Sequence, residues 1–207
     1  MIPRFVVTGT DTGIGKTIFA AALTGALNGS YWKPVQSGLD GETDRQTVER
    51  LGGVPRARIL PEAYRLSTPV SPHFSARRNG VTINSASGRW AAGDRRGSGA
   101  AGAALGRSRL RRYLRPLADP GDPLRQDVAR HDQPHAAFSQ ALKHRAIPVF
   151  GLVFIGDENN ETQRIICEMG SVRPLGRLPW LPNLDRESLR QAFRDQFDLA
   201  SFVEVSA

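Results

Sequence analysis

Nine residues near the amino terminus have the composition and spacing of a phosphate-binding loop. The run from Gly9 to Thr17 reads GTDTGIGKT, follows a short apolar segment and precedes a helical pattern. Glycines let backbone N–H groups approach phosphate oxygens, and the N-terminus of the following helix adds partial positive charge. In this chemistry Lys16 reaches the β- and γ-phosphates of a nucleotide, and the Thr17 hydroxyl holds Mg²⁺. One residue more than in the P-loop pattern separates Gly9 from Gly15, so Thr10 takes the first glycine position.

A second cluster of reactive side chains follows shortly after this loop. The run KPVQSG from Lys33 to Gly38 comes after a candidate strand. We therefore expect Lys33 and Ser37 to face a reacting anion from the carboxyl edge of a sheet, where open α/β sheets bind ligands. Lysine is scarce, with three residues against 25 arginines, and two of the three lie in these loops. Asp44 is a candidate direct or indirect Mg²⁺ ligand, although an acid in the first turn of a helix explains it equally well.

The elements that would position these residues alternate between strands and helices. Short apolar runs predict buried strands at 5–7, 31–32 and 147–155. Periodic stretches bounded by stop signals predict helices at 18–27, 42–51, 161–169 and 186–197. This alternation predicts βαβ units, and together with the phosphate loop it predicts an α/β fold of the P-loop NTPase type. We expect a mostly parallel sheet flanked by helices, in a single ATP-binding domain over 1–207.

Composition and charge restrict the class of protein. The single cysteine, Cys167, cannot form an intrachain disulfide, which argues against a small disulfide-stabilised secreted scaffold. No run of 18 apolar residues is present, and we expect no signal peptide, no membrane partner and a cytoplasmic location. The net charge of +8 suggests an acidic partner such as nucleic acid. However, residues 85–138 hold ten Arg and five Asp with no Lys or Glu, a net +5, which leaves +3 for the remainder.

The motifs taken together resemble those of the dethiobiotin synthetase family. They are GTDTGIGKT, KPVQSG, the following Asp44 and the run YRLSTPVSPH at 64–73. The resemblance extends over residues 3–83 and about 140–182. It implies a cytoplasmic, homodimeric, ATP- and Mg²⁺-dependent cyclo-ligase of biotin biosynthesis, with no nucleic-acid partner. Such an enzyme carboxylates 7,8-diaminononanoate with CO₂, phosphorylates the carbamate with ATP and closes the ureido ring.

The resemblance also implies catalytic roles for individual residues. Lys16 and Lys33 would neutralise the charge that develops on the transferred phosphoryl group and on the carbamate. Thr12 is the third candidate catalytic residue. Ser37 would contact the substrate. These four residues are the predicted chemical centre of the site.

Further residues would hold the nucleotide and its metal ion. Thr17 and Asp44 are the candidate metal ligands. The candidate ATP-binding residues are Gly13, Ile14, Gly15, Lys16, Thr17 and Ile18 in the loop, with Pro179, Trp180 and Leu181 on the adenine side. A core loop explains the last three equally well. Residues 157–159 are a further candidate near the base.

The resemblance breaks down between residues 85 and 138. The family has there a buried strand that ends in an acidic metal ligand, in a segment like Val-Glu-Gly-Ala-Gly-Gly, and later a segment like Gly-x-Ile-Asn-His. Residues 85–138 contain no Ile and one Val, Val128, with eleven Ala and seven Gly. This composition cannot supply the apolar run of a parallel strand. We therefore expect this segment to be disordered or poorly packed, and the acidic ligand to be missing from the printed sequence.

A shifted reading frame explains this segment. One permitted back-translation of Gln126 to His135, read one base later, gives Arg-Thr-Ser-Leu-Gly-Thr-Ile-Asn-His, and stretches between 93 and 125 give family-like runs in the same frame. Reading codons out of phase also explains the Arg excess without a nucleic-acid surface. The hypothesis predicts family-like structure from residue 139 onward and a printed polypeptide that is unstable or inactive. The other interpretation is a genuine Arg-, Ala- and Gly-rich insertion.

Two other classes of function remain open from the residues. A P-loop ATPase switch of the partitioning type carries an extra lysine early in its loop, where residues 10–12 stand here, and it has no role for KPVQSG. A nucleic-acid-binding protein would require the basic segment to be folded. ATP turnover that depends on diaminononanoate and bicarbonate, turnover stimulated by DNA or a protein, or salt-dependent DNA binding would discriminate the three.

Overall fold

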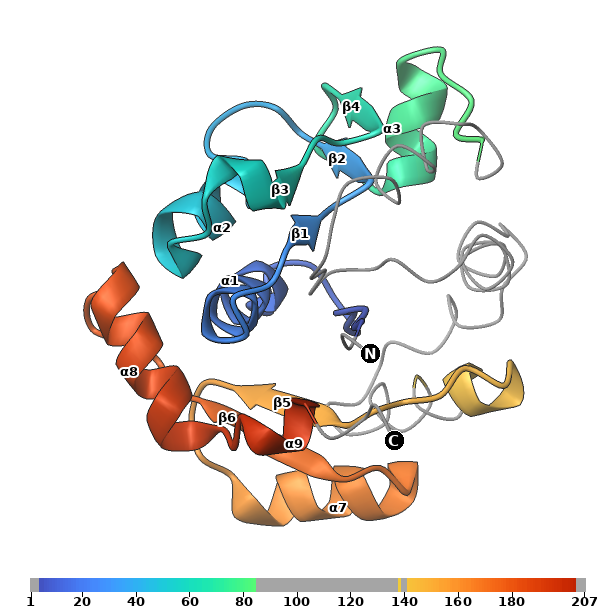
Figure 1. The fold of residues 1–207 in the computed structure, drawn as a ribbon. Helices are drawn as coiled ribbons and strands as arrows, with labels where there is room; N and C mark the ends of the chain where they lie inside the picture. Colours follow the sequence, from blue (N-terminus) through green and yellow to red (C-terminus); the bar gives the residue numbers. More distant parts are fainter. Residues whose placement is uncertain (1–3, 85–137, 139–140, 204–207) are drawn as a thin grey trace.

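The computed structural model describes residues 4–84, 138 and 141–203 (Figure 1). Within these residues every pair of strands is parallel and helices flank the pairs, which confirms the mostly parallel α/β architecture. The expectation that 85–138 packs poorly concerns a segment that, apart from residue 138, lies outside the described residues. None of the helices in the described part of the chain is long and apolar enough to cross a membrane.

The described residues 4–84 contain four short strands and three α-helices. In chain order the elements are α1 (Lys16–Ala26), β1 (Tyr31–Trp32), β2 (Val35–Ser37), α2 (Asp44–Gly52), the 3₁₀ turn η1 (Arg56–Arg58), β3 (Ile59–Leu60), β4 (Tyr64–Leu66) and α3 (Pro72–Arg78). The first two helices confirm the helices predicted at 18–27 and 42–51. The strand predicted at 31–32 is confirmed as β1. It pairs with β3, and β2 pairs with β4.

Each of these strands is half of a longer, interrupted strand. The carbonyl oxygen of Pro34 accepts hydrogen bonds from the amides of both Ala63 and Tyr64, at 2.8 and 3.0 Å. The second interrupted strand therefore contains one extra residue at the break, which is a β-bulge in a parallel pair. The break places Lys33 and Glu62 on neighbouring strands, where neither belongs to a regular ladder.

Helices α1 and α2 approach each other closely because glycines lie at their contact. A Cβ on Gly25 would lie 2.4 Å from the carbonyl oxygen of Gly52, and a Cβ on Gly52 would lie 2.5 Å from the carbonyl oxygen of Ala21. Neither position can carry a side chain without moving the backbone opposite. Asn28 has a left-handed φ of 51° just after α1, a backbone conformation in which helices commonly end.

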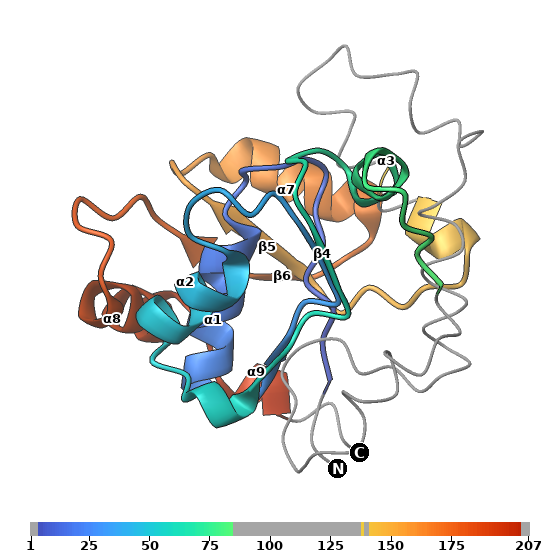
Figure 2. The ribbon, with the colours of Figure 1, turned by 90° about the horizontal axis from the view of Figure 1, so that it is seen from above.

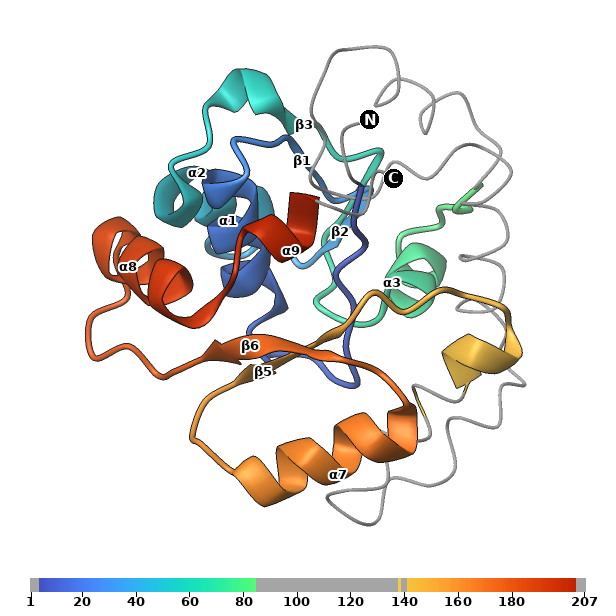
Figure 3. The same cartoon turned by 60° about the horizontal axis from the view of Figure 1, so that its bottom comes forward.

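The carboxyl-terminal half contains the third strand pair. Its elements are β5 (Leu152–Ile155), α7 (Asn160–Gly170), β6 (Pro174–Leu178), α8 (Arg186–Gln196) and α9 (Ala200–Val203). Helix α7 covers one side of the β5–β6 pair, and α8 and α9 lie on the other (Figure 3). Seen from above, α8 lies beside α1 and α2 (Figure 2), so one layer of helices joins the two halves. The predicted helices at 161–169 and 186–197 are confirmed, but the strand predicted at 147–155 is only 152–155.

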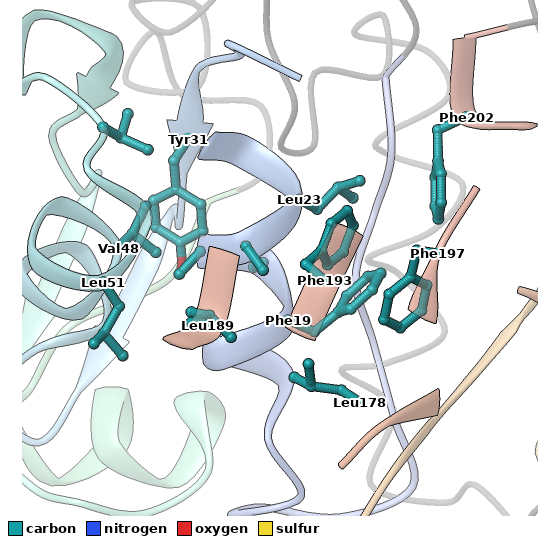
Figure 4. Close-up of a cluster of buried hydrophobic side chains, with 14 of the residues drawn as sticks. Phe19, Leu23, Tyr31, Val48, Leu51, Leu178, Leu189, Phe193, Phe197 and Phe202 are labelled. Carbon is teal, nitrogen blue, oxygen red and sulfur yellow. The ribbon is translucent and has the colours of Figure 1, made fainter. Parts of the chain in front are cut away.

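The main hydrophobic core lies between α1, α2, α8 and the β5–β6 pair (Figure 4). Leu189 and Phe193 of α8 are 0 % and 1 % exposed. The ring centroid of Phe19 in α1 lies 5.9 Å from that of Phe193 and 5.5 Å from that of Phe197. Aromatic packing between α1 and α8 therefore supports the helix that begins at the phosphate loop.

The buried strand predicted at 5–7 is wrong. The backbone of these residues has no regular strand structure, and the side chains of Val6 and Val7 are 54 % and 36 % exposed. Phe5 alone turns inward, with its ring centroid 5.1 Å from that of Phe150. An apolar run becomes a buried strand only when neighbouring strands accept its hydrogen bonds on both sides. Within the described residues, no strand pairs with this segment.

Candidate functional site

The phosphate loop has the backbone conformation that its glycines predict. Gly13 and Gly15 have φ values of +72° and +83°, and Gly15 directly precedes α1. Left-handed residues of this kind turn successive N–H groups into a concave site for anions. A Cβ on Gly13 would meet nothing within 4 Å, so its backbone is open to a ligand. A Cβ on Gly15 would lie 2.7 Å from Cδ1 of Ile155, at the end of β5.

Polar groups of the loop bind one another. The Lys16 ammonium donates to the carbonyl oxygen of Asp11. The Thr12 amide donates to the Asp11 carboxylate at 2.6 Å, and its hydroxyl donates to the same oxygen at 3.4 Å. A phosphate oxygen carries negative charge, so it adds a Coulombic attraction to the Lys16 ammonium that the neutral backbone carbonyl lacks. A phosphate oxygen would therefore hold Lys16 more strongly than the backbone carbonyl does.

Lys33 and Asp44 form an ion pair at the first turn of α2. The Lys33 ammonium donates to Oδ2 of Asp44, and the two side chains are 33 % and 27 % exposed. The helix begins with a capping box in which the Thr43 amide donates to Oε1 of Gln46 at 2.8 Å. The structure thus brings together two predicted site residues. Asp44 is an acid in the first turn of a helix, which was the alternative to a metal ligand, and it is also the partner of Lys33.

Two buried polar atoms at the end of β2 have no hydrogen-bond partner among the described residues. They are Oγ of Ser37 and Oε1 of Gln36. The amide of the Gln36 side chain donates to the carbonyl oxygens of Ser37 at 3.2 Å and Gly38 at 3.1 Å, so this side chain is held in place. A buried hydroxyl without a partner is costly. An unsatisfied hydroxyl at the carboxyl end of a parallel strand is where a polar ligand would bind.

Trp180 lies at the carboxyl edge of the β5–β6 pair. Its side chain is 67 % exposed, and a Cβ on Gly156 would lie 3.0 Å from the indole Nε1. Gly156 follows β5 and Trp180 follows β6, so two parallel strands end here. Because Gly15 approaches Ile155 at the same end of β5, the phosphate loop and Trp180 lie at one edge. Trp180 is therefore not a core residue, whereas Leu181 does pack against the core.

The segment 157–159 is exposed and leads from β5 into α7. Oδ1 of Asn159 accepts the Thr162 amide at 3.0 Å, which makes Asn159 the N-cap of α7. Arg177 donates to the carbonyl oxygen of Gly156 at 2.8 Å and pairs with Glu158 at 3.5 Å. These contacts hold the segment against β6, beside the edge where Trp180 lies.

The predicted site residues carry donor groups of the kinds that suit a nucleotide and a magnesium ion. The open backbone at Gly13 can receive phosphate oxygens, and Lys16 supplies a positive charge. Thr17, in the first turn of α1, and Asp44 carry oxygen ligands of the kind that Mg²⁺ binds together with phosphates and water. Among the residues that the structure describes, no group of three or more His, Cys, Asp or Glu side chains could hold a metal ion.

The sequence analysis missed a second ion pair at the first turn of α2, between Arg45 and Glu62. Nη1 of Arg45 lies 3.4 Å from Oε2 of Glu62, whose side chain is only 2 % exposed. Burial raises the pKa of the Tyr31 phenol, and the negative charges of Asp44 and Glu62 raise it further. A glutamate within the apolar run from Ile59 to Tyr64 was the available signal, because charged residues are rarely buried without a function or a partner.

Comparisons with known proteins agree with these features. A family model described as an AAA domain matches residues 3–94 and 134–188. The chain is 53 % identical over 209 residues to a protein of Agrobacterium fabrum, with 99 % of each chain covered. It is 49 % identical over 212 residues to a protein of Nitrobacter hamburgensis, with 100 % of each covered. Both relatives are named ATP-dependent dethiobiotin synthetase.

The two kinds of comparison differ in the middle of the chain. The family model leaves out residues 95–133, which is most of the segment for which we expect a shifted reading frame. The relatives align across that segment as well. The family model matches again from residue 134, and family-like structure from residue 139 onward stays a prediction. The names of the relatives favour the synthetase interpretation over an ATPase switch of the partitioning type.

Proposed function

This chain belongs to the dethiobiotin synthetase family, and we propose that it is an ATP-dependent ligase that makes dethiobiotin in biotin biosynthesis. It joins 7,8-diaminononanoate to CO₂ and closes the ureido ring, with ADP and phosphate as the other products. One amine attacks CO₂ to form a carbamate, and a carbamate oxygen accepts the γ-phosphoryl group of ATP. The second amine then attacks the carbamoyl carbon, and phosphate leaves.

The pairing of Lys33 with Asp44 carries this proposal within the structure. A nucleotide switch of the partitioning type has no role for the KPVQSG run, whereas in this chain the lysine of that run pairs with the first turn of a second helix. A carbamate and the phosphate that leaves are both anions, so a second cation is required in this chemistry. Lys33 supplies it in the proposed site, and the unsatisfied Oγ of Ser37 contacts the substrate.

We assign the phosphate loop to ATP in this mechanism. The backbone of residues 13–18 holds the phosphates, and Lys16 neutralises charge on the transferred phosphoryl group. Thr12, which precedes these residues in the loop, is the third proposed catalytic residue. The exposed face of Trp180, with Pro179 and Leu181 on either side, receives the adenine by stacking. Mg²⁺ bound by Thr17 and Asp44 would supply neutralising charge to the phosphates. The proposed enzyme acts as a cytoplasmic homodimer on small molecules.

The decisive experiment compares two lysine variants. Lys33→Met should lower kcat for ADP release with diaminononanoate, bicarbonate, ATP and Mg²⁺ by at least about 100-fold, the usual loss for a group that stabilises transition-state charge. Nucleotide binding should remain, because the phosphate loop is untouched. Lys143→Met is the matched control, since Lys143 is exposed on a separate helical turn, and it should leave turnover unchanged.

Two results would contradict the proposal. One is ADP release that does not depend on diaminononanoate. The other is ADP release stimulated by DNA, which would favour a partitioning-type switch. Equal loss in both lysine variants would show that Lys33 has no specific role.

The reading frame needs its own test. Resequencing the gene across codons 80 to 142 would show whether two compensating shifts are present. If they are, the frame-restored chain should be active and the printed chain inactive or unstable. Equal turnover by the two chains would refute the expected effect of the altered segment.

A further inference from the structure

Glu62 is a buried carboxylate with an incomplete set of partners. Its side chain is 2 % exposed, and Oε2 lies 3.4 Å from Nη1 of Arg45. Its other oxygen, Oε1, has no hydrogen-bond partner among the described residues. Arg45 is 31 % exposed and can reach water. The desolvation of the Glu62 carboxylate is therefore only partly offset.

An ion pair of this kind contributes little to stability. A buried carboxylate loses its hydration, and a single long contact to a half-exposed guanidinium does not restore it. An uncharged side chain of the same shape at residue 62 removes the desolvated charge, and Arg45, which is 31 % exposed, is left in contact with water. The charge at Glu62 therefore points to a role other than stability.

The place of Glu62 in the fold indicates that role. Asp44 and Arg45 are consecutive residues in the first turn of α2, and each forms an ion pair with a different interrupted strand. Asp44 binds Lys33 at the break between β1 and β2, and Arg45 binds Glu62 at the break between β3 and β4. Two ion pairs from consecutive residues therefore hold one helical turn against two neighbouring strands.

We propose that Glu62 is a positioning residue, which acts through Arg45 to hold the first turn of α2 so that Asp44 faces Lys33. The inference rests on the proposed functions of Lys33 and Asp44. The β-bulge at the break gives Glu62 its position, because the extra residue leaves it outside the ladder and directed to α2. Without the negative charge of Glu62, Arg45 would turn to water. The first turn of α2 would then keep only one of its two ion pairs with the strands, the pair between Asp44 and Lys33.

The first test asks whether the first turn of α2 stays in place in the protein without nucleotide. Glu62→Gln keeps the shape of the side chain and removes its charge. We expect faster hydrogen–deuterium exchange at the amides of residues 45–48, with little change in the thermal unfolding midpoint. Glu168→Gln is the matched control, because Glu168 forms an exposed pair with Arg164 at 2.7 Å on α7, away from α2. This control should change neither quantity.

The second test measures the consequence for the proposed metal site. Groups that orient metal ligands change metal affinity by about 10- to 100-fold when they are removed. Glu62→Gln should raise by about 10-fold the Mg²⁺ concentration that half-saturates ATP binding, while Glu168→Gln should not. Arg45→Gln should have the same effect, and the double variant should show no further loss, because both residues act through one contact.

The outcomes separate the two proposals. Unchanged exchange at 45–48 together with an unchanged Mg²⁺ requirement would overturn the role of Glu62. A large fall in the unfolding midpoint with an unchanged Mg²⁺ requirement would also overturn it, and would make Glu62 a structural residue only. Faster local exchange in a chain that never turns over diaminononanoate would support the positioning role and contradict the proposed function.

Discussion

The contact between the phosphate loop and β5 allows a quantitative test with two neighbouring glycines. Gly13 and Gly15 both have left-handed φ values, +72° and +83°. An alanine at either position carries the backbone strain of an L-residue there, about 1 kcal/mol. The surroundings differ, since nothing lies within 4 Å of a Cβ on Gly13, whereas Cδ1 and Cγ2 of Ile155 lie 2.7 and 3.1 Å from a Cβ on Gly15.

The expected losses of stability follow from this difference. Gly13→Ala should lower the free energy of unfolding by about 1 kcal/mol, which is strain alone. Gly15→Ala should lower it by about 2–4 kcal/mol, because overpacking against Ile155 adds about 1–3 kcal/mol. The double variant Gly15→Ala with Ile155→Val lacks the nearest atom, Cδ1. We expect it to lose about 1 kcal/mol less than the sum of its single variants.

Urea denaturation with linear extrapolation measures the unsubstituted chain, the three single variants (Ile155→Val included) and the double variant on one scale. The measurement is made without nucleotide, because a bound ligand would raise the apparent stability of any chain that still binds it. Equal free energies of unfolding for Gly13→Ala and Gly15→Ala would refute the contact between the loop and β5. Full additivity of Gly15→Ala and Ile155→Val would refute it independently.

Two further predictions concern α8, the helix that packs behind α1. Leu189→Ala should lower the free energy of unfolding by about 2–5 kcal/mol, because Leu189 is 0 % exposed and its removal leaves a cavity. Urea denaturation measures this loss, and a loss below about 1 kcal/mol would contradict the burial of Leu189. Hydrogen bonds from the Ser188 amide and hydroxyl hold the pKa of Asp185 below its ordinary value of 3.8. The stability that Asp185 contributes is therefore present above that value and lost as the pH falls through the lowered pKa. Asp185→Asn, which keeps the cap, should flatten the fall of the unfolding midpoint on the acid side, and an unchanged acid limb would contradict the assignment.

Local patterns in the sequence were sufficient for the helices and for the phosphate loop. The stop at Asn28 and the glycines before α1 act within a few residues, so their effects can be read from the chain itself. The segment 5–7 shows where such reading fails. Its apolar run matches a buried strand, but a strand also needs neighbours, and Val6 is 54 % exposed.

In the candidate site too, the sequence indicated the residue types but not the contacts between them. The residue types of Lys16, Lys33 and Asp44 indicated phosphate chemistry, but no pattern indicated that Lys33 and Asp44 would form an ion pair. The pair between Arg45 and Glu62 was missed, since Glu62 reaches α2 only because of a bulge that periodicity does not reveal.

The sequence by itself determined which chemical groups this protein has and which local conformations carry them. Glycines at 13 and 15 permit left-handed backbone, and lysines at 16 and 33 supply positive charge, wherever the rest of the chain lies. Only the tertiary structure decided that Gly15 meets the end of β5 and that Trp180 covers Gly156. Such contacts join residues far apart in the chain, so they depend on strand register and helix packing, which the whole fold sets together.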